Sequence, residues 1–309
     1  MRVSTQNVFE RGLSTLQKRQ IELMNMQEQL TSGKRVARGS DDPAAAARAE
    51  RALATQMRSA SDQRALEASR NAMTQAESAL GDAEELLQQA REHMVAAGDA
   101  TYSDAERKSL AVAIRGLRTQ LLGVANRGDG AGNYLFGGQG AQQTPFLDAT
   151  GGVQFRGTAG ESQAAMQEAM PLALDGRSSW LQAVNPSTGQ PDLSVFDVLD
   201  RVANELDTPG RSADEISQSV KDGLRDIDAV AGNLRSHRAR VGELLNRGDA
   251  VEVRLSQQAL SAQTERSAAE DLDMVQAVSS FQSKQTGYDA AMQTYAMVQR
   301  MSLFDYIKG

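Results

Sequence analysis

The chain has 309 residues, 40% hydrophobic but only 4% aromatic, and this mixture favours long helices over a compact mixed sheet. It has no cysteine, which excludes disulfide frameworks and thiolate metal sites. The net charge is −7, the basic residues of both ends are spread among apolar ones, and aromatic residues for base stacking are scarce. We therefore predict neither nucleic acid nor a membrane as a partner.

No stretch approaches the ~20 consecutive apolar residues that span a bilayer. The first 20 residues contain no apolar run long enough for the core of a cleaved signal peptide. If the protein leaves the cell, we expect it to use a route that reads no cleaved signal. None of the six prolines precedes Pro43 or follows Pro209, so both ends are free of helix breakers.

A heptad pattern begins close to the N-terminus. The apolar residues that recur at seven-residue spacing are Phe9, Leu16, Leu23 and Leu30. This spacing places them on one face of a helix over residues 5–32, as in a coiled coil. Gly33 is a favourable residue for ending that helix. Residues 33–42 then read as a loop.

Two further helices are predicted from their start signals. Asp42-Pro43 favours a start, because aspartate caps and proline suits the first helical position, and the helix should run from 43 to about 97. Its second half alternates large and small apolar residues: Met73, Ala76, Leu80, Ala83, Leu87, Ala90, Met94 and Ala97. Ser103 and Glu106 have the spacing of a capping box, which opens a helix over about 104–126 and predicts an antiparallel hairpin.

The pattern changes after Arg127. Glycine and proline gather over residues 128–191 with short apolar bursts, which predicts turns and short β-strands. A helix is expected over about 192–206. A long helical region follows over about 212–303, with Gly248 as the candidate interruption.

The C-terminal part of that region carries a second heptad pattern. One series is Met274, Phe281, Tyr288 and Tyr295, and the interleaved series is Val278, Gln285, Met292 and Gln299. Both ends of the chain thus carry heptad seams that can pair. The fold class is predicted to be mainly α, with a long antiparallel coiled coil or helical bundle formed by the N- and C-terminal regions and a small inserted β-rich domain.

Residues that carry chemistry are scarce. His93 and His237 lie in predicted helices without the spacing of metal ligands or a catalytic triad. The glycines around 128–132 and 137–140 follow a helix, and a phosphate loop requires a strand before it. We therefore predict no catalytic residue, no metal and no cofactor, and the chain is not expected to be an enzyme.

Several motifs resemble the flagellin superfamily. QEQLTSGKRVARGSDDPAAAARA at residues 27–49 is similar to the N-terminal signature of that superfamily. MRVSTQNVF, NYLFGG, RARVGELLNRGD and the final SLFDYIKG resemble its hook-associated members more than filament flagellin. The similarity extends over both ends and the centre. One departure is that Ile307, Lys308 and Gly309 follow the SLFDY motif, near which relatives commonly stop.

The resemblance implies a structural subunit of the bacterial flagellum at the junction between hook and filament. It implies export through the flagellar type III channel without a cleaved signal peptide, and an extracellular location. The implied partners are the other hook-associated protein, flagellin subunits, an export chaperone, and copies of the chain itself in a ring.

The resemblance also implies three domains. Residues 1–42 and 266–309 would form an inner terminal coiled-coil domain, which we expect to be disordered in the monomer. Residues 43–127 and 192–265 would form a helical bundle. Residues 128–191 would form the β-rich outer domain.

The expected assembly interface combines the two end seams with the last apolar residues. It comprises Phe9, Leu16, Leu23, Leu30, Met274, Val278, Phe281, Tyr288, Met292, Tyr295, Leu303 and Phe304. Two alternatives stay open. Filament flagellin would polymerise into long tubes by itself. A cytoplasmic coiled-coil adaptor would form a stable soluble dimer with ordered ends.

Overall fold

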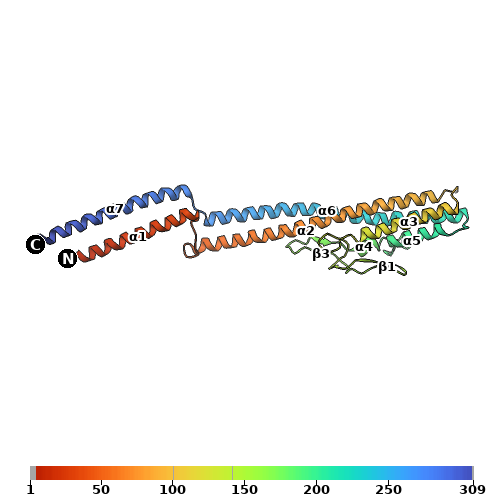
Figure 1. The fold of residues 1–309 in the computed structure, drawn as a ribbon, viewed down its shortest axis with the longest axis horizontal. Coiled ribbons are helices and arrows are strands. Elements are labelled where there is room, and N and C mark those ends of the chain that lie inside the picture. Colours follow the sequence, from red (N-terminus) through yellow and green to blue (C-terminus); the bar gives the residue numbers. More distant parts are fainter. Residues whose placement is uncertain (1–4, 100, 141, 308–309) are drawn as a thin grey trace. The chain divides into compact units, whose positions relative to one another are not determined.

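The computed structural model describes residues 5–99, 101–140 and 142–307, with side chains described for 10–99, 101–140 and 142–297 (Figure 1). Its helices in these ranges are α1 (Thr5–Ser32), α2 (Pro43–Ala97), α3 (Asp104–Ala125), α4 (Gly176–Trp180), α5 (Val195–Asp207), α6 (Ala213–Glu270) and α7 (Met274–Ile307). Its strands are β1 (Phe146–Ala149), β2 (Gly152–Phe155), β3 (Ser162–Gln163) and β4 (Pro171–Ala173). The predicted mainly α fold with a small β-containing insert is confirmed.

The chain divides into two compact units. The terminal unit consists of residues 1–59 and 257–309, and the central unit consists of residues 60–256. Helices α2 and α6 contribute residues to both units. The three-domain division expected from the sequence stays a prediction.

Local signals set the helix ends where the sequence predicts them. Helix α1 is followed by Gly33, whose φ of +70° is favourable only for glycine. A carboxylate oxygen of Asp42 accepts a hydrogen bond of 3.0 Å from a backbone N–H in the first turn of α2. Ser103 and Glu106 form the predicted capping box of α3, with the Ser103 N–H donating to Glu106 Oε2 at 2.7 Å.

The long C-terminal helical region breaks at a place that the sequence analysis does not predict. Helix α6 runs without interruption through Gly248, so the expected break there is wrong. The break lies at residues 271–273. It is fixed by a distant bond, in which the Leu272 N–H donates to the Gly33 carbonyl at 3.0 Å. Asp273 then restarts the helix, because its carboxylate accepts from backbone N–H groups of the first turn of α7 at 3.0 and 3.1 Å.

The core of the central unit lies between α3, α5 and the adjoining parts of α2 and α6. The alternating large and small residues predicted for α2, from Met73 to Ala97, are all buried. Helix α6 comes close to its neighbours at Gly223, where an added Cβ would lie 2.5 Å from Met94 Cε and 2.9 Å from Val202 Cγ2. Small residues therefore allow the helices to approach one another.

The insert joins this core through aromatic side chains. Trp180 at the end of α4 lies with its ring centroid 5.3 Å from Phe136, 6.3 Å from Phe146 and 6.1 Å from Phe196 of α5. All four side chains are fully buried. The contacts with Phe136 and Phe146 are edge-on and the contact with Phe196 is stacked, and aromatic contacts of these kinds add to the gain from apolar burial. The insert is thus held on the helices through their common core.

Two short antiparallel hairpins complete the insert. Strands β1 and β2 pair with Phe146 opposite Phe155, and β3 pairs with β4 with Ser162 opposite Ala173. The apolar burst at residues 134–138 forms only isolated bridges. Beside the second hairpin is a small separate core, formed by Leu66 of α2, Met170 next to β4, and Val251 and Leu255 of α6.

Candidate assembly surface

Helices α1 and α7 lie side by side and antiparallel within the terminal unit (Figure 1). Six of the predicted interface residues are covered in this unit: Leu16 is buried, and Leu23, Leu30, Phe281, Tyr288 and Tyr295 are half-buried. The ring of Tyr295 lies against Gly12, where a Cβ would come within 3.3 Å of Tyr295 Cδ2. The two end seams therefore pair with each other in the structure.

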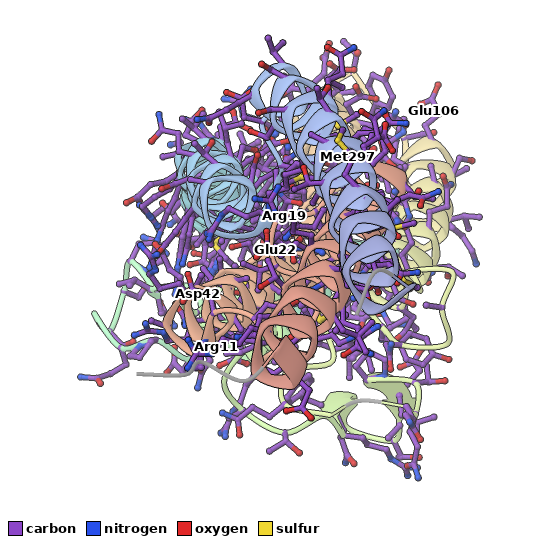
Figure 2. All side chains as sticks on the ribbon, turned by 90° about the vertical axis from the view of Figure 1, so that its left-hand side faces the viewer. Arg11, Arg19, Glu22, Asp42, Glu106 and Met297 are labelled. Carbon is purple, nitrogen blue, oxygen red and sulfur yellow. The ribbon has the colours of Figure 1, made fainter. Side chains whose placement is uncertain are left out.

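Polar contacts also cross between the two helices. Arg19 Nη1 donates to the backbone carbonyl of Gly287 at 2.8 Å, and Lys284 Nζ lies 3.4 Å from Glu22 Oε2. Figure 2 labels Arg19 and Glu22, which reach from α1 towards α7. A Cβ at Gly287 would lie 2.8 Å from Arg19 Nη1, so the absence of a side chain leaves room for this guanidinium. These contacts fix the pair in one register.

Large apolar side chains also face solvent on both helices. The exposed ones are Leu13, Ile21 and Met24 on α1, and Met274, Val275, Val278, Met292 and Met297 on α7. Val275 is the most exposed of them, at 84%. Each helix of a pair covers only one face of the other, whereas α7 is apolar on more than one face. A helix that is apolar on several faces is typical of one with several neighbours.

The predicted interface residues therefore divide into three groups. Six are covered within the α1–α7 pair, as described above. Met274, Val278 and Met292 are exposed. The side chains of Phe9, Leu303 and Phe304 lie outside the described residues.

The two connections that lead to α1 and α7 are bonded to each other. We call residues 33–36 and 269–273 the paired turns. The Arg35 N–H donates to the Glu270 carbonyl at 2.7 Å, and the Arg35 guanidinium donates to the Ala269 carbonyl at 2.7 Å. The paired turns hold the start of α7 beside the end of α1.

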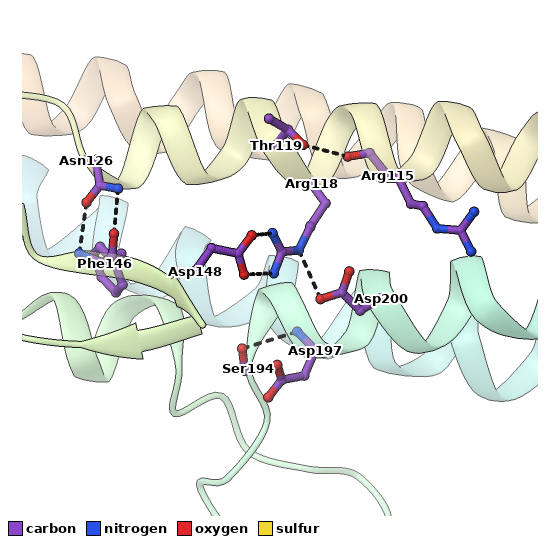
Figure 3. Close-up of polar contacts among 9 residues, drawn as sticks. All are labelled: Arg115, Arg118, Thr119, Asn126, Phe146, Asp148, Ser194, Asp197 and Asp200. Carbon is purple, nitrogen blue, oxygen red and sulfur yellow. Dashed lines mark hydrogen bonds and ion pairs between the residues drawn. The ribbon is translucent and has the colours of Figure 1, made fainter. Parts of the chain in front are cut away.

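A buried arginine organises the central unit (Figure 3). Arg118 of α3, only 8% exposed, donates through both terminal nitrogens to Asp148 of β1, at 2.8 Å for Nη2, and through Nε to Asp200 of α5 at 3.0 Å. The hydrogen bonds that Arg118 donates to Asp148 lower the pKa of the Asp148 carboxyl and raise the pKa of the Arg118 guanidinium. This cluster ties the β1–β2 hairpin to two helices.

Sequence reasoning missed the Arg118 cluster. Its partners lie 30 and 82 residues along the chain, which no local pattern reveals. The available signal is the position of Arg118 on the apolar face of α3, four residues after Ile114. A charged residue on such a face requires a partner.

In the described part of the chain, no group of three or more histidine, aspartate and glutamate side chains could hold a metal ion. Burial lowers the pKa of the His237 imidazole and so favours its neutral form. None of the described helices has the length and apolar character needed to cross a bilayer.

Comparison with known proteins agrees with this architecture. The model of the bacterial flagellin N-terminal helical region matches residues 3–141, and that of the C-terminal helical region matches residues 224–307. Flagellar hook-associated protein 3 of Salmonella typhimurium is 31% identical over 315 residues, covering 98% of this chain and 99% of its own length. The chain belongs to the flagellar hook-associated protein 3 family.

Other members of the flagellar hook-associated protein 3 family give the same picture. The Escherichia coli protein is 29% identical over 317 residues, covering all of both chains. The crystal structure of flagellar hook-associated protein 3 from Legionella pneumophila has a TM-score of 0.62 at 17% identity, covering 70% of this chain and 96% of that chain. At that identity the structural likeness is one of fold.

The resemblance inferred from sequence motifs is thus confirmed. In this member of the flagellar hook-associated protein 3 family, the motif at residues 27–49 spans the end of α1, one of the paired turns and the start of α2. NYLFGG supplies Phe136 to the aromatic cluster. The motif residues therefore build helix ends and packing contacts.

Proposed function

We propose that this chain is a structural subunit of the bacterial flagellum that joins hook to filament and assembles through α1 and α7. The observation that carries the proposal is the exposed apolar surface of this helix pair. Apolar surface that is left on paired helices marks a site for further protein neighbours. Membership of the flagellar hook-associated protein 3 family supports the same function.

The neighbours we propose are the other hook-associated protein, flagellin subunits and further copies of this chain in a ring. The interface would comprise all twelve residues of the two end seams and the last apolar residues, from Phe9 to Phe304. Burying one leucine or aromatic side chain stabilises by roughly 2 kcal/mol before conformational entropy is subtracted. Several such residues in each subunit, repeated around a ring, would order the ends.

Before assembly, the inner domain formed by residues 1–42 and 266–309 would be disordered in solution. A lone helix pair buries too little apolar area to be stable by itself. An export chaperone would hold the C-terminal helix, and the unfolded ends would pass the type III channel without a cleaved signal. The helical bundle and the insert, 128–191, would fold without these ends.

The function is one of interface geometry, and we propose that the chain is not an enzyme. Its location would be outside the cell, in the flagellum between hook and filament. The buried Arg118 supports a structural role, because its ion pairs with Asp148 and Asp200 connect the insert to the helical bundle. Such a cluster positions structural elements.

A charge placed in the covered seam tests the proposal. Phe281→Asp would place a carboxylate at a half-buried position of α7, and we expect cells that carry it to lose motility and to secrete unassembled filament subunits. The matched control is Gln143→Asp, which makes the same charge change at an exposed position of the insert. Intact motility with Phe281→Asp would contradict the proposal.

Limited proteolysis of the purified monomer tests the state of the ends. We expect about the first 40 and last 40 residues to be lost while a resistant central core remains, as mass spectrometry of the fragments would show. Protected ends would contradict disorder before assembly and would favour a stable dimeric adaptor.

A further inference from the structure

Methionine side chains are distributed unevenly between the two units. Among the described side chains, those that are largely exposed are Met24 (60%), Met57 (62%), Met274 (47%), Met292 (47%) and Met297 (61%), and all five belong to the terminal unit. Met73, Met94 and Met170 of the central unit are at most 1% exposed. The reactive thioethers that face solvent are therefore concentrated in one unit.

The exposed sulfur atoms also lie on the helices that carry the apolar surface. Met24 belongs to α1, and Met274, Met292 and Met297 belong to α7; Figure 2 labels Met297 on that helix. Their exposed apolar neighbours are aliphatic residues such as Ile21 and Val275. Methionine is thus the group on this surface that an oxidant can change.

The chemistry is a two-electron oxidation. A hydroperoxide transfers its outer oxygen to the thioether sulfur, so that a sulfur–oxygen bond forms and the oxygen–oxygen bond breaks. The sulfur is oxidised to a sulfoxide, the peroxide is reduced, and water or an alcohol leaves. The reaction requires access to the sulfur and turns a flexible apolar side chain into a polar one.

We propose that Met24, Met274, Met292 and Met297 are modification sites for hydroperoxides, and that their sulfoxides block packing of α1 and α7 against neighbouring subunits. The inference rests on the proposed function, because it requires that this surface is buried on assembly. A sulfoxide oxygen buried without a hydrogen-bond donor opposes packing. The same sulfur atoms would be protected once neighbours cover them, so the sensitive stage precedes incorporation.

The first experiment maps the modification. The purified full-length chain is exposed to graded hydrogen peroxide and quenched, and its peptides are analysed by mass spectrometry. We expect one oxygen to be gained first at the four proposed sites and at Met57, and only at higher doses at Met73, Met94 and Met170. Equal rates in both groups would overturn the assignment of the sites.

The second experiment measures assembly. Treated and untreated chains are added to hook preparations from cells that lack this protein, and incorporation is counted by electron microscopy with a specific antibody. We expect incorporation to fall in proportion to the oxygen gained at the four sites, and to recover after treatment with methionine sulfoxide reductases. Unchanged incorporation at full oxidation would overturn the inference.

Leucine variants assign the effect to particular sulfur atoms. A fourfold variant with Met24→Leu, Met274→Leu, Met292→Leu and Met297→Leu keeps the surface apolar and is expected to incorporate after peroxide treatment. Met57→Leu removes an equally exposed thioether from α2, and this control is expected to stay sensitive. A fourfold variant that is as sensitive as the unaltered chain would show that oxidation acts elsewhere, and the inference would fail.

The two proposals fail in different ways. If Phe281→Asp prevents incorporation while peroxide does not, the inference is wrong and the proposed function stands. If Phe281→Asp incorporates normally, the proposed function is wrong, whatever the oxidation map shows.

Discussion

The terminal and central units are built from similar helices and differ in what those helices bury. Among the described side chains, the largest that are fully buried, including Trp180 and Phe196, all lie in the central unit. The terminal unit buries mainly alanines, such as Ala45 and Ala277, together with Leu16 and Val36. Its other large apolar side chains, among those described, are half-buried or exposed.

This difference shows that a heptad pattern does not by itself distinguish a core from an interface. Full burial of a leucine or phenylalanine stabilises by roughly 1.5–3 kcal/mol, and a buried alanine contributes much less. We therefore expect the central unit to be stable by itself and the terminal unit to depend on neighbours for its stability. A core is distinguished from an interface by the size of the side chains that are buried in the monomer.

The largest expected effect comes from shortening a fully buried leucine of the central unit, and the comparison is with a half-buried leucine of the terminal unit. Leu121→Ala removes a fully buried side chain from α3 and should lower the free energy of unfolding by about 2–5 kcal/mol. Leu23→Ala, in the terminal unit, should leave that transition unchanged. Urea titrations followed by the fluorescence of Trp180, the sole tryptophan, report on the central unit alone. Equal losses for both variants would contradict the division into independent units.

Removing the buried arginine should have the next largest effect. Arg118→Met leaves Asp148 and Asp200 without their partner, but their side chains are 50% and 38% exposed and can be hydrated. We therefore expect a loss of about 2 kcal/mol, below that of a fully buried pair. The control is Arg115→Met, which breaks a half-exposed pair with Asp207 at the edge of the helices and should cost less than about 1 kcal/mol. The same fluorescence titration compares them, and a larger loss for the control would rule out this account.

A smaller effect is expected at the start of α3. Ser103→Ala removes the hydroxyl that accepts from the Glu106 N–H and should cost about 1 kcal/mol. Ser109→Ala is the matched control, because its hydroxyl bonds only to a carbonyl of its own helix, and it should stay within about 0.5 kcal/mol. Thermal unfolding of both variants measures the difference between their losses in the free energy of unfolding. Equal losses would show that the capping box does not stabilise the helix.

The smallest effect is a dependence on pH. Hydrogen bonds from the backbone N–H groups of Ser103 and Ser212 lower the pKa values of Glu106 and Glu215 below the ordinary value of 4.5. A lowered pKa means that the folded state binds the proton less tightly. The resulting stabilisation is complete above pH 4.5 and is lost as the pH falls through the folded pKa values.

This dependence can be isolated with one double variant. Glu106→Gln with Glu215→Gln keeps acceptors at both helix starts but removes the two titrating groups. Unfolding midpoints measured between pH 6 and pH 3 should therefore fall less steeply for the variant than for the unaltered chain. Identical slopes would show that other carboxylates control the response to acid.

The features that the sequence predicts are those with local causes. Pro43, the Ser103 capping box and Gly33 lie next to the helix ends that they set, and the structure has those ends as predicted. The break at residues 271–273 could not be predicted, because it depends on a bond from Leu272 to Gly33 at the other end of the chain.

The candidate surface shows the same limit. Heptad spacing identifies both series of α7, but not the rotation of the helix about its own axis. That rotation, which depends on contacts such as Arg19 to Gly287, decides that Phe281 is covered and Val278 is exposed. A pattern along one helix contains no information about where its neighbour lies.

The paired turns connect α1 and α7 to the rest of the chain at one place, so these two helices could be replaced together. Residues 33–36 and 269–273 are bonded to each other largely through main-chain atoms. The connection from α1 to α2 and the connection from α6 to α7 therefore lie side by side. Recombination between related genes, or a designed chimaera, could replace both ends at this place and keep the same backbone bonds. Helices α1 and α7 could then diverge in evolution together, while the genes continued to share the chain from α2 to α6.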